Sequence, residues 1–137
     1  MKKTGGFTLM ELVIVLAILA IIAAILIPTF LNVTDRARLR SDIQSARAIQ
    51  NAMELFQAER GTPVAGANMA AILTNLQTAG FMDAQATDIQ TAGATWVLNA
   101  SRVVLVDISA ATVSDSIHRV ARGLPDDERI FVTGIRP

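Results

Sequence analysis

The sequence predicts an α+β fold in which a long N-terminal helix, apolar in its first half, packs on a small antiparallel sheet with short peripheral helices. Residues 12–31 carry no charge and are mostly Leu, Ile, Val and Ala. Residues 39–56 repeat apolar side chains every three or four positions, which indicates a helix with one buried face. Residues 95–108 are rich in β-branched residues, which favour strands.

The composition fits one small domain with few reactive side chains. The 137 residues suffice for a single modest core. Twelve basic and twelve acidic side chains balance, so no net charge draws the chain to nucleic acid. With one His, no Cys and no phosphate-binding glycine motif, catalysis would need carboxylates and hydroxyls alone. We therefore expect no enzyme activity, no catalytic residues, no resident metal and no cofactor.

The apolar run is long enough to cross a membrane, because about 20 apolar residues in a helix span the ~30 Å of a bilayer core. Lys2 and Lys3 precede the run, and the positive-inside rule then predicts a cytoplasmic N-terminus with the remainder outside. Arg36, Arg38 and Arg40 follow the run closely and favour the opposite orientation, an alternative that stays open. The possible binding partners of these three arginines are carboxylates of the protein, lipid head groups and DNA phosphates.

Two features distinguish this segment from an ordinary secretory signal. Such a signal places its small-residue cleavage site after the apolar core, whereas Gly5 and Gly6 come before it. Cleavage there leaves the apolar helix on the mature chain. The second feature is Glu11, a carboxylate one turn into the apolar run. Inserting a charge costs ~2.5–3.5 kcal/mol, and such a residue usually has a partner.

Residues 6–12, Gly-Phe-Thr-Leu-Met-Glu-Leu, with the apolar continuation to Pro28, resemble the leader and first helix of type IV prepilins and the related pseudopilins. The resemblance implies leader cleavage between Gly6 and Phe7 by a prepilin peptidase, and N-methylation of Phe7. It also implies that Phe7, Glu11 and Pro28 serve subunit assembly. Pro28 removes a helical hydrogen bond, which favours a kink.

The resemblance further implies partners and a location. The partners are copies of the chain in a helical filament, the prepilin peptidase, the inner-membrane pilus assembly machinery, and membrane lipid before assembly. The precursor lies in the bacterial inner membrane and the mature subunit in an extracellular pilus. The implied domains are the leader, 1–6, the transmembrane or filament-core helix, 7–31, and a globular pilin-like domain, 32–137, which includes the second half of the long helix.

A six-residue leader followed by Phe resembles the type IVa branch. Residues 17–21, Ala-Ile-Leu-Ala-Ile, depart from the many pilins that carry a glycine in this region. Since Ala favours helix over Gly by ~0.8–1 kcal/mol, local unwinding on assembly is less favoured here.

Three functions agree with these features. The first is a type IV pilin used for adhesion, twitching motility or DNA uptake. The second is a pseudopilin of a type II secretion system. The absence of an aspartate- and tryptophan-bearing calcium loop near the C-terminus argues against the major pseudopilin. The third is a monomeric membrane-anchored binding module, which Glu11 opposes because a lone anchor has no use for that charge.

The long helix is expected to continue to Arg60 and to end at Gly61 and Pro63. Asp42 is expected to pair with Arg38 at i,i+4. The apolar side chains that form one stripe along this helix, expected to be buried, are Leu39, Ile43, Ala46, Ile49, Met53 and Phe56. The residues expected to face outward are Arg36, Arg40, Arg47 and Glu54. We expect residues from about Gln44 onward to form a soluble domain on their own.

A short helix follows, with Asn68 as its N-cap, Gly80 at its end and Phe81 folding back on it. Its expected buried face is Met69, Ile72, Leu73 and Leu76. Residues 83–93 are polar and predict a loop.

Two strands are predicted next, Thr95–Asn99 and Arg102–Ile108, joined by a tight turn. A helix over Thr112–Arg122 is expected from a capping-box pattern of Thr112 and Asp115, and a last strand over Arg129–Thr133.

Two polar features remain. His118 is expected to be a solvated surface side chain. Asp126, Asp127 and Glu128 predict an acidic turn; the alternative is a calcium site completed by Asp107 or Asp115.

Overall fold

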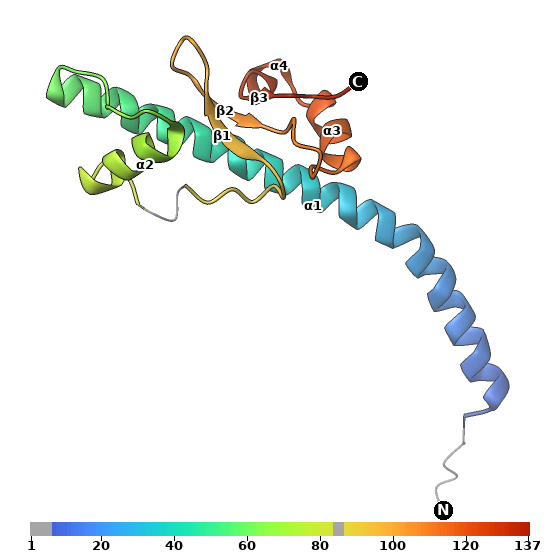
Figure 1. Cartoon of the computed structure of the whole chain (residues 1–137). Helices are drawn as coiled ribbons and strands as arrows, with labels where there is room; N and C mark the ends of the chain where they lie inside the picture. Colours follow the sequence, from blue (N-terminus) through green and yellow to red (C-terminus); the bar gives the residue numbers. More distant parts are fainter. Residues whose placement is uncertain (1–6, 84–86) are drawn as a thin grey trace, which may run out of the picture. The chain divides into compact units, whose positions relative to one another are not determined.

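The computed structural model of the chain describes residues 7–83 and 87–137, without the side chains of Pro28, Thr29 and Leu31. The chain forms two compact units, Met1–Val33 and Thr34–Pro137, and the first helix contributes to both. The elements are α1 (Leu9–Arg60), α2 (Met69–Thr78), β1 (Thr95–Leu98), β2 (Val104–Asp107), α3 (Asp115–Arg122), α4 (Asp126–Arg129) and β3 (Val132–Thr133) (Figure 1). The predicted α+β class is confirmed.

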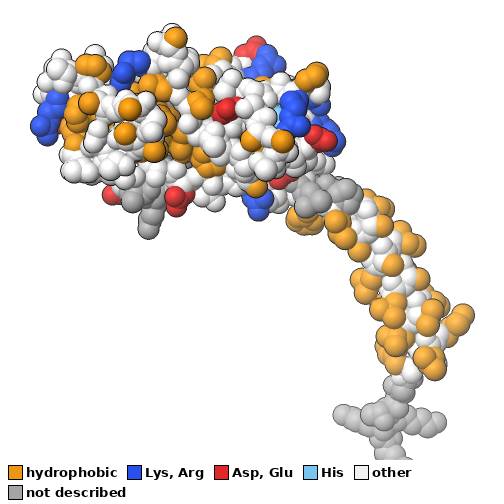
Figure 2. All heavy atoms as spheres, viewed as in Figure 1, with side chains coloured by type: hydrophobic (Ala, Val, Ile, Leu, Met, Phe, Trp, Pro, Cys, Tyr) orange, Lys and Arg blue, Asp and Glu red, His pale blue; other side chains and the backbone are white. Residues whose placement is uncertain are grey.

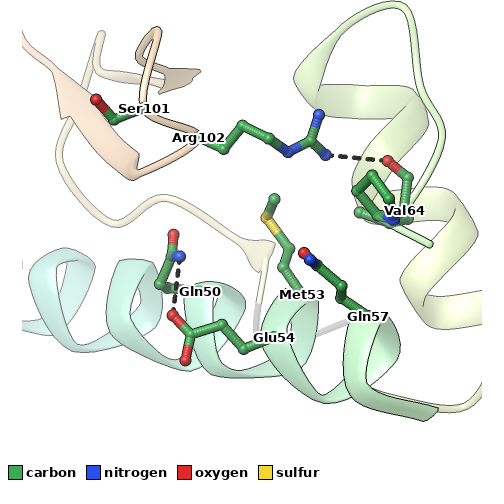
Figure 3. A pocket seen from close by; sticks show the side chains of 8 residues that line it. Gln50, Met53, Glu54, Gln57, Val64, Ser101 and Arg102 are labelled. Carbon is green, nitrogen blue, oxygen red and sulfur yellow. Dashed lines mark hydrogen bonds between the residues drawn. The ribbon is translucent and has the colours of Figure 1, made fainter. Parts of the chain in front are cut away.

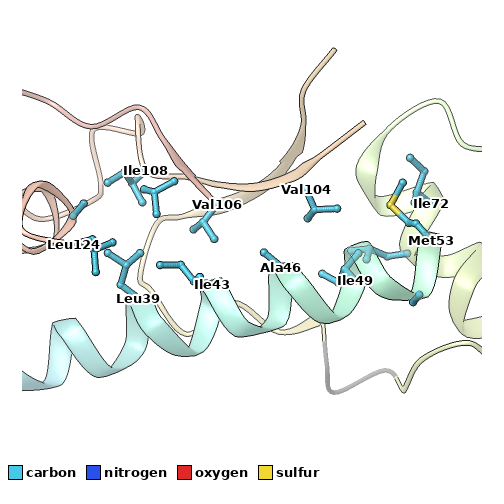
Figure 4. Packing of buried hydrophobic residues seen from close by; sticks show 14 of the residues in the cluster. Leu39, Ile43, Ala46, Ile49, Met53, Ile72, Val104, Val106, Ile108 and Leu124 are labelled. Atoms are coloured by element: carbon cyan, nitrogen blue, oxygen red, sulfur yellow. The ribbon is translucent and has the colours of Figure 1, made fainter. Parts of the chain in front are cut away.

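The core of the second unit lies between α1 and the sheet. The predicted apolar stripe of α1 faces inward, and its residues Leu39, Ala46 and Ile49 are fully buried. In Figure 4 this stripe points towards Val104 and Val106 of β2. The 3.6-residue repeat of α1 and the two-residue repeat of β2 therefore meet at one interface, as the sequence pattern predicts.

The sheet has three strands in the order β1-β2-β3. β1 pairs antiparallel with β2, as predicted, and Trp96 lies opposite Val106. β3 pairs parallel with β2, with Val132 opposite Val106. The expectation of a purely antiparallel sheet is therefore wrong for β3. The physical reason is the connection from β2 to β3, which carries α3 and α4 and is long enough for the crossover that a parallel pair requires.

The ends of the first two helices follow local sequence signals. α1 ends at Arg60 because Gly61 adopts a left-handed backbone with φ of 71°. The side chain of Asn68 accepts the N–H of Ala71 at 2.9 Å and caps α2. At the other end the N–H of Phe81 donates to the carbonyl of Leu76 at 3.0 Å. The Phe81 ring then meets that of Phe56 edge to face, with centroids 5.4 Å apart.

The helix predicted over Thr112–Arg122 and the strand predicted over Arg129–Thr133 are both shorter than predicted. α3 begins at Asp115, with Ser114 as its N-cap residue, so the capping box at Thr112 is wrong. Residues 110–113 form a turn instead. The guanidinium of Arg136 donates hydrogen bonds to the carbonyls of Ala110 and Val113 in this turn. A contact with the distant C-terminus therefore outweighs the local helix signal.

The acidic run begins α4, a short helix after Pro125, rather than a turn before a long strand. Acids in a first helical turn are favoured by the helix dipole. Glu128 pairs with Arg40 at 3.1 Å and Asp127 with Arg47 at 3.7 Å, which ties α4 to α1. Among the described residues, no group of three acidic or histidine side chains is placed to hold a metal ion.

The expected ion pair between Arg38 and Asp42 is also wrong. Asp42 is fully buried, and its two carboxylate oxygens accept the N–H groups of Gln90 and Thr91, each at 2.8 Å. A buried carboxylate needs such hydrogen bonds to replace its water. Asp42 therefore fixes the loop before β1 onto α1.

His118 is buried as well, with 2% of its surface exposed, so the expected solvated histidine is wrong. The C-terminal segment covers this part of α3, and the backbone N–H of Arg136 donates to Nδ1 of His118 at 3.2 Å. The sequence pattern of α3 could not reveal this contact, because it depends on a segment that lies 18 residues away.

The structure moves the expected start of an independently folding fragment from Gln44 to Thr34. A fragment that begins at Thr34 is expected to fold, whereas one that begins at Gln44 is now expected not to fold. The shorter fragment lacks Leu39, Asp42 and Ile43, which the structure places in the core. Each large apolar side chain lost from a core costs about 2–5 kcal/mol, against a typical total stability of 5–15 kcal/mol. Circular dichroism with thermal unfolding of both fragments tests this expectation. A cooperative transition of the Gln44 fragment that matches that of the Thr34 fragment would contradict it.

Candidate assembly surface

The first unit presents an apolar helical surface that nothing in the described chain covers. Every large apolar side chain from Phe7 to Val33 whose position is described is 44–83% exposed. Figure 2 shows hydrophobic side chains along the visible face of this part of the helix, outside the atoms drawn in grey. By length and composition α1 is able to cross a membrane, and its apolar stretch has no buried share. Such a surface requires lipid or other apolar protein surface around it.

The N-terminus of this helix is a reciprocal capping box. Thr8 precedes the first helical residue, Leu9, and its Oγ1 accepts the backbone N–H of Glu11 at 3.2 Å. Oε2 of Glu11 accepts the backbone N–H of Thr8 at 2.9 Å and the Thr8 hydroxyl at 3.0 Å. The Glu11 carboxylate is therefore held at the tip of the helix, where the helix dipole favours a negative charge.

Thr8 is the site residue that the sequence interpretation missed. The spacing Thr-x-x-Glu directly before an apolar run is the local signal that could have identified it. The hydroxyl and the carboxylate form hydrogen bonds with each other, so Glu11 is not left without a partner in the single chain. The carboxylate lies next to the backbone of the residue that follows Phe7.

The other predicted site residues are placed only in part. Phe7 is the first described residue and is 75% exposed, while Gly6 lies outside the described residues. Helix α1 continues through Pro28, whose side chain is outside the described set. The cleavage junction and the assembly role of Pro28 therefore stay predictions.

The second unit has a small pocket of about 200 Å³ at one end of α1 (Figure 3). Its polar groups bond within the chain. The guanidinium of Arg102 donates to the carbonyl of Val64 at 3.1 Å, and Gln50 donates to Glu54 at 3.1 Å. Its lining residues include one carboxylate and no histidine. They therefore lack the paired acid and base that general acid–base catalysis uses.

Comparison with known proteins points to the N-terminal segment. The family described as the prokaryotic N-terminal methylation motif matches residues 1–27. This range contains the predicted cleavage junction, Phe7 and Glu11. No solved structure matches the chain.

Several curated proteins are similar to part of the chain. Prepilin peptidase-dependent protein A of Clostridium perfringens is 47% identical over 58 residues, which cover 42% of this chain and 41% of that protein. A fimbrial protein of Pseudomonas aeruginosa is 43% identical over 54 residues, covering 39% and 35%. Type II secretion system core protein G of Vibrio cholerae is 28% identical over 75 residues, covering 54% and 51%. The chain thus spans about half or less of the length of these relatives.

Proposed function

We propose that this chain, a member of the type IV pilin and pseudopilin family, is a structural subunit of a type IV pilus, assembled from the inner membrane into a helical surface filament. The observation that carries the proposal is the exposed apolar helix with one carboxylate at its tip, four residues after Phe7. The subunit is a structural protein and not an enzyme. Filaments of this kind serve adhesion, twitching motility or DNA uptake.

The precursor is held in the inner membrane by α1, with Lys2 and Lys3 on the cytoplasmic side. A prepilin peptidase removes residues 1–6, which carry both lysines of the chain. The new N-terminus is the amine of Phe7, which is then N-methylated. The cut leaves a positive charge next to Thr8, at the helix tip that also carries the Glu11 carboxylate.

Assembly replaces lipid by protein around the same apolar surface. In the membrane, lipid tails cover residues 7–31. In the filament, the corresponding helices of neighbouring copies cover them. The inner-membrane assembly machinery moves the subunit between these two environments. The apolar surface is never exposed to water, so its burial costs no unfavourable hydration at either stage.

Phe7, Glu11 and Pro28 have distinct parts in this assembly. The amine of Phe7 and the carboxylate of Glu11 supply opposite charges to neighbouring subunits. Pro28 lacks a backbone N–H, so the helix loses one internal hydrogen bond at this point and bends there more readily.

A pseudopilus subunit of a type II secretion system is the second candidate. The match to a secretion core protein G extends over 75 residues, further than the 58 and 54 residues shared with the pilus-related proteins above. Identity favours the pilus, since it is 43% with the fimbrial protein and 28% with the secretion protein.

Cleavage is expected between Gly6 and Phe7. Intact-mass analysis of the protein purified from membranes should give a chain of residues 7–137 with one N-methyl group, lacking Lys2 and Lys3. A product that retains Met1, or one cut after the apolar run, would contradict the assignment.

Deletion of the gene distinguishes the two candidates. If the chain is a pilus subunit, cells lacking it should lose surface filaments in electron micrographs and keep their secreted proteins. Loss of secreted proteins with unchanged surface filaments would favour the pseudopilus. A plasmid copy of the wild-type gene should restore the lost property.

A further inference from the structure

The C-terminal segment, residues 134–137, is attached to the second unit mainly through Arg136. Its backbone N–H donates to Nδ1 of His118 at 3.2 Å, and its carbonyl accepts from the guanidinium of Arg122 at 2.8 Å. Its own guanidinium donates to the carbonyls of Ala110 and Val113 at 2.9 and 3.2 Å. One residue therefore connects this segment to α3 and to the turn before it.

The first of these contacts fixes the protonation state of His118. A ring nitrogen that accepts a hydrogen bond carries no proton, so the neutral imidazole must bear its proton on Nε2. Nε2 is buried and has no hydrogen-bond partner among the described residues. The buried imidazole thus makes a single hydrogen bond within the described chain, and that bond exists only while Nδ1 is unprotonated.

The charges around His118 oppose a second proton. Burial lowers the pKa of His118, and the guanidinium of Arg136 lowers it further. On α3 itself, Asp115 acts in the opposite direction and Arg122 in the same direction as Arg136. Asp115 also faces Arg136 at 4.0 Å, and the turn over residues 109–114 carries no charged side chain.

The two residues before Arg136 pack against the rest of the second unit. Gly134 has a φ of 75°, and a Cβ there would lie 2.6 Å from the backbone and side chain of Ser109. Ile135 packs against the core cluster next to it. A protonated His118 would place two N–H donors, its own Nδ1–H and that of Arg136, against each other. Two donors that face each other cannot form a hydrogen bond, so protonation removes this contact and leaves the amide of Arg136 without its acceptor.

We propose that His118 is an acid-sensitive latch: the neutral imidazole holds residues 134–137 on α3, and its protonation releases them. In the released state the imidazole is solvated and regains an ordinary pKa of about 6.5. Because the attached state has the lower pKa, attachment is fully stable above about pH 6.5 and weakens as the pH falls below that value.

The test is hydrogen exchange of the Arg136 amide, followed by NMR on the full chain in detergent micelles at about pH 7.5 and about pH 5. Protection, corrected for the intrinsic exchange rate at each pH, should fall severalfold at the lower pH, because the released state takes up the proton more readily than the attached state. The matched variant is His118→Asn, whose side-chain oxygen takes the position of Nδ1 and does not titrate. Its protection should stay constant within about twofold.

Two results would overturn the latch. One is constant protection of the Arg136 amide in the wild-type chain at both pH values. The other is an equal fall in the His118→Asn variant, which would place the titrating group elsewhere. If this variant does not fold, ¹⁵N shifts of the wild-type imidazole decide. Protonation of Nδ1 together with loss of Arg136 protection supports the latch, and protonation with protection retained refutes it.

Discussion

Replacement of Glu11 by Val is expected to abolish filaments while membrane insertion and leader cleavage continue. The substitution removes a charge from an apolar helix, so insertion should be unharmed or improved. The peptidase site keeps Gly6 and Phe7, so processing should proceed. Breaking one side of a buried ion pair costs about 3–5 kcal/mol, which predicts a loss of filaments of about 100-fold or more.

The physical reason is a charge pair between copies of the chain. Cleavage creates an amine at Phe7, and a neighbouring subunit can bring its Glu11 carboxylate alongside it. In a low-dielectric filament core this attraction gains several-fold over its value in water. It also offsets the desolvation cost that each charge would bear alone. Docking is then favoured at one register, where every Glu11 meets an amine.

The capping box provides matched controls for this experiment. Glu11→Gln keeps the hydrogen bonds to Thr8 and removes the charge, so filaments should be lost as with Val. Thr8→Val removes the hydroxyl contacts and keeps the charge, so the loss should be smaller, in line with the ~0.5–2 kcal/mol of a helix cap. Glu11→Asp keeps the charge with a shorter reach and should retain some filaments.

The measurement compares a membrane fraction and a sheared-filament fraction from the same cells, both probed for this protein. A normal filament yield from Glu11→Val would refute the charge-pair mechanism and leave the helix bundle explained by apolar packing alone. A normal yield from Glu11→Gln with none from Glu11→Val would assign the effect to the helix cap instead.

Replacement of Asp42 by Ala is expected to destabilise the second unit by about 2–4 kcal/mol, because the backbone N–H groups of Gln90 and Thr91 lose charged acceptors. Thr91 is buried, so water cannot fully replace the lost oxygen. For a unit of this size the thermal midpoint should fall by roughly 10–20 °C.

The matched control is Arg38→Ala on the same helix. If Asp42 acted only through an i,i+4 ion pair with Arg38, the two substitutions would cost the same few tenths of a kcal/mol. The structure gives Asp42 different partners, so Arg38→Ala should change stability by less than about 0.5 kcal/mol. Thermal unfolding of the fragment from Thr34, followed by circular dichroism, tests both variants. Equal destabilisation by the two would contradict the buried-carboxylate account.

Features set by neighbouring residues could be predicted from the sequence. The stripe of α1 follows from its repeat, and the ends of α2 follow from Asn68 and Gly80. Features set by distant residues could not. The partners of Asp42 lie 48 and 49 residues away, and no periodicity in α1 indicates them. The parallel pairing of β3 depends in the same way on the course of the chain through α3 and α4.

The residues of the candidate site also differ in how far the sequence alone identifies them. Phe7 and Glu11 stand out because a motif and an isolated charge mark them in the sequence. Thr8 carries an equally local signal, yet its role becomes visible only when its hydroxyl and the Glu11 carboxylate are placed together. In the proposed filament other copies of the chain cover the apolar surface of α1, and contacts between chains leave no periodicity or motif in the sequence of one chain.

The central claim is that copies of this chain form a filament in which α1 helices are paired by charge. Electron cryomicroscopy of sheared wild-type filaments tests it most directly. The account predicts a filament built of this chain from Phe7 onward, with the Phe7 amine of one subunit within about 4 Å of the Glu11 carboxylate of a neighbour. A filament in which Glu11 contacts only Thr8 of its own chain, and no amine of a neighbour, would contradict it.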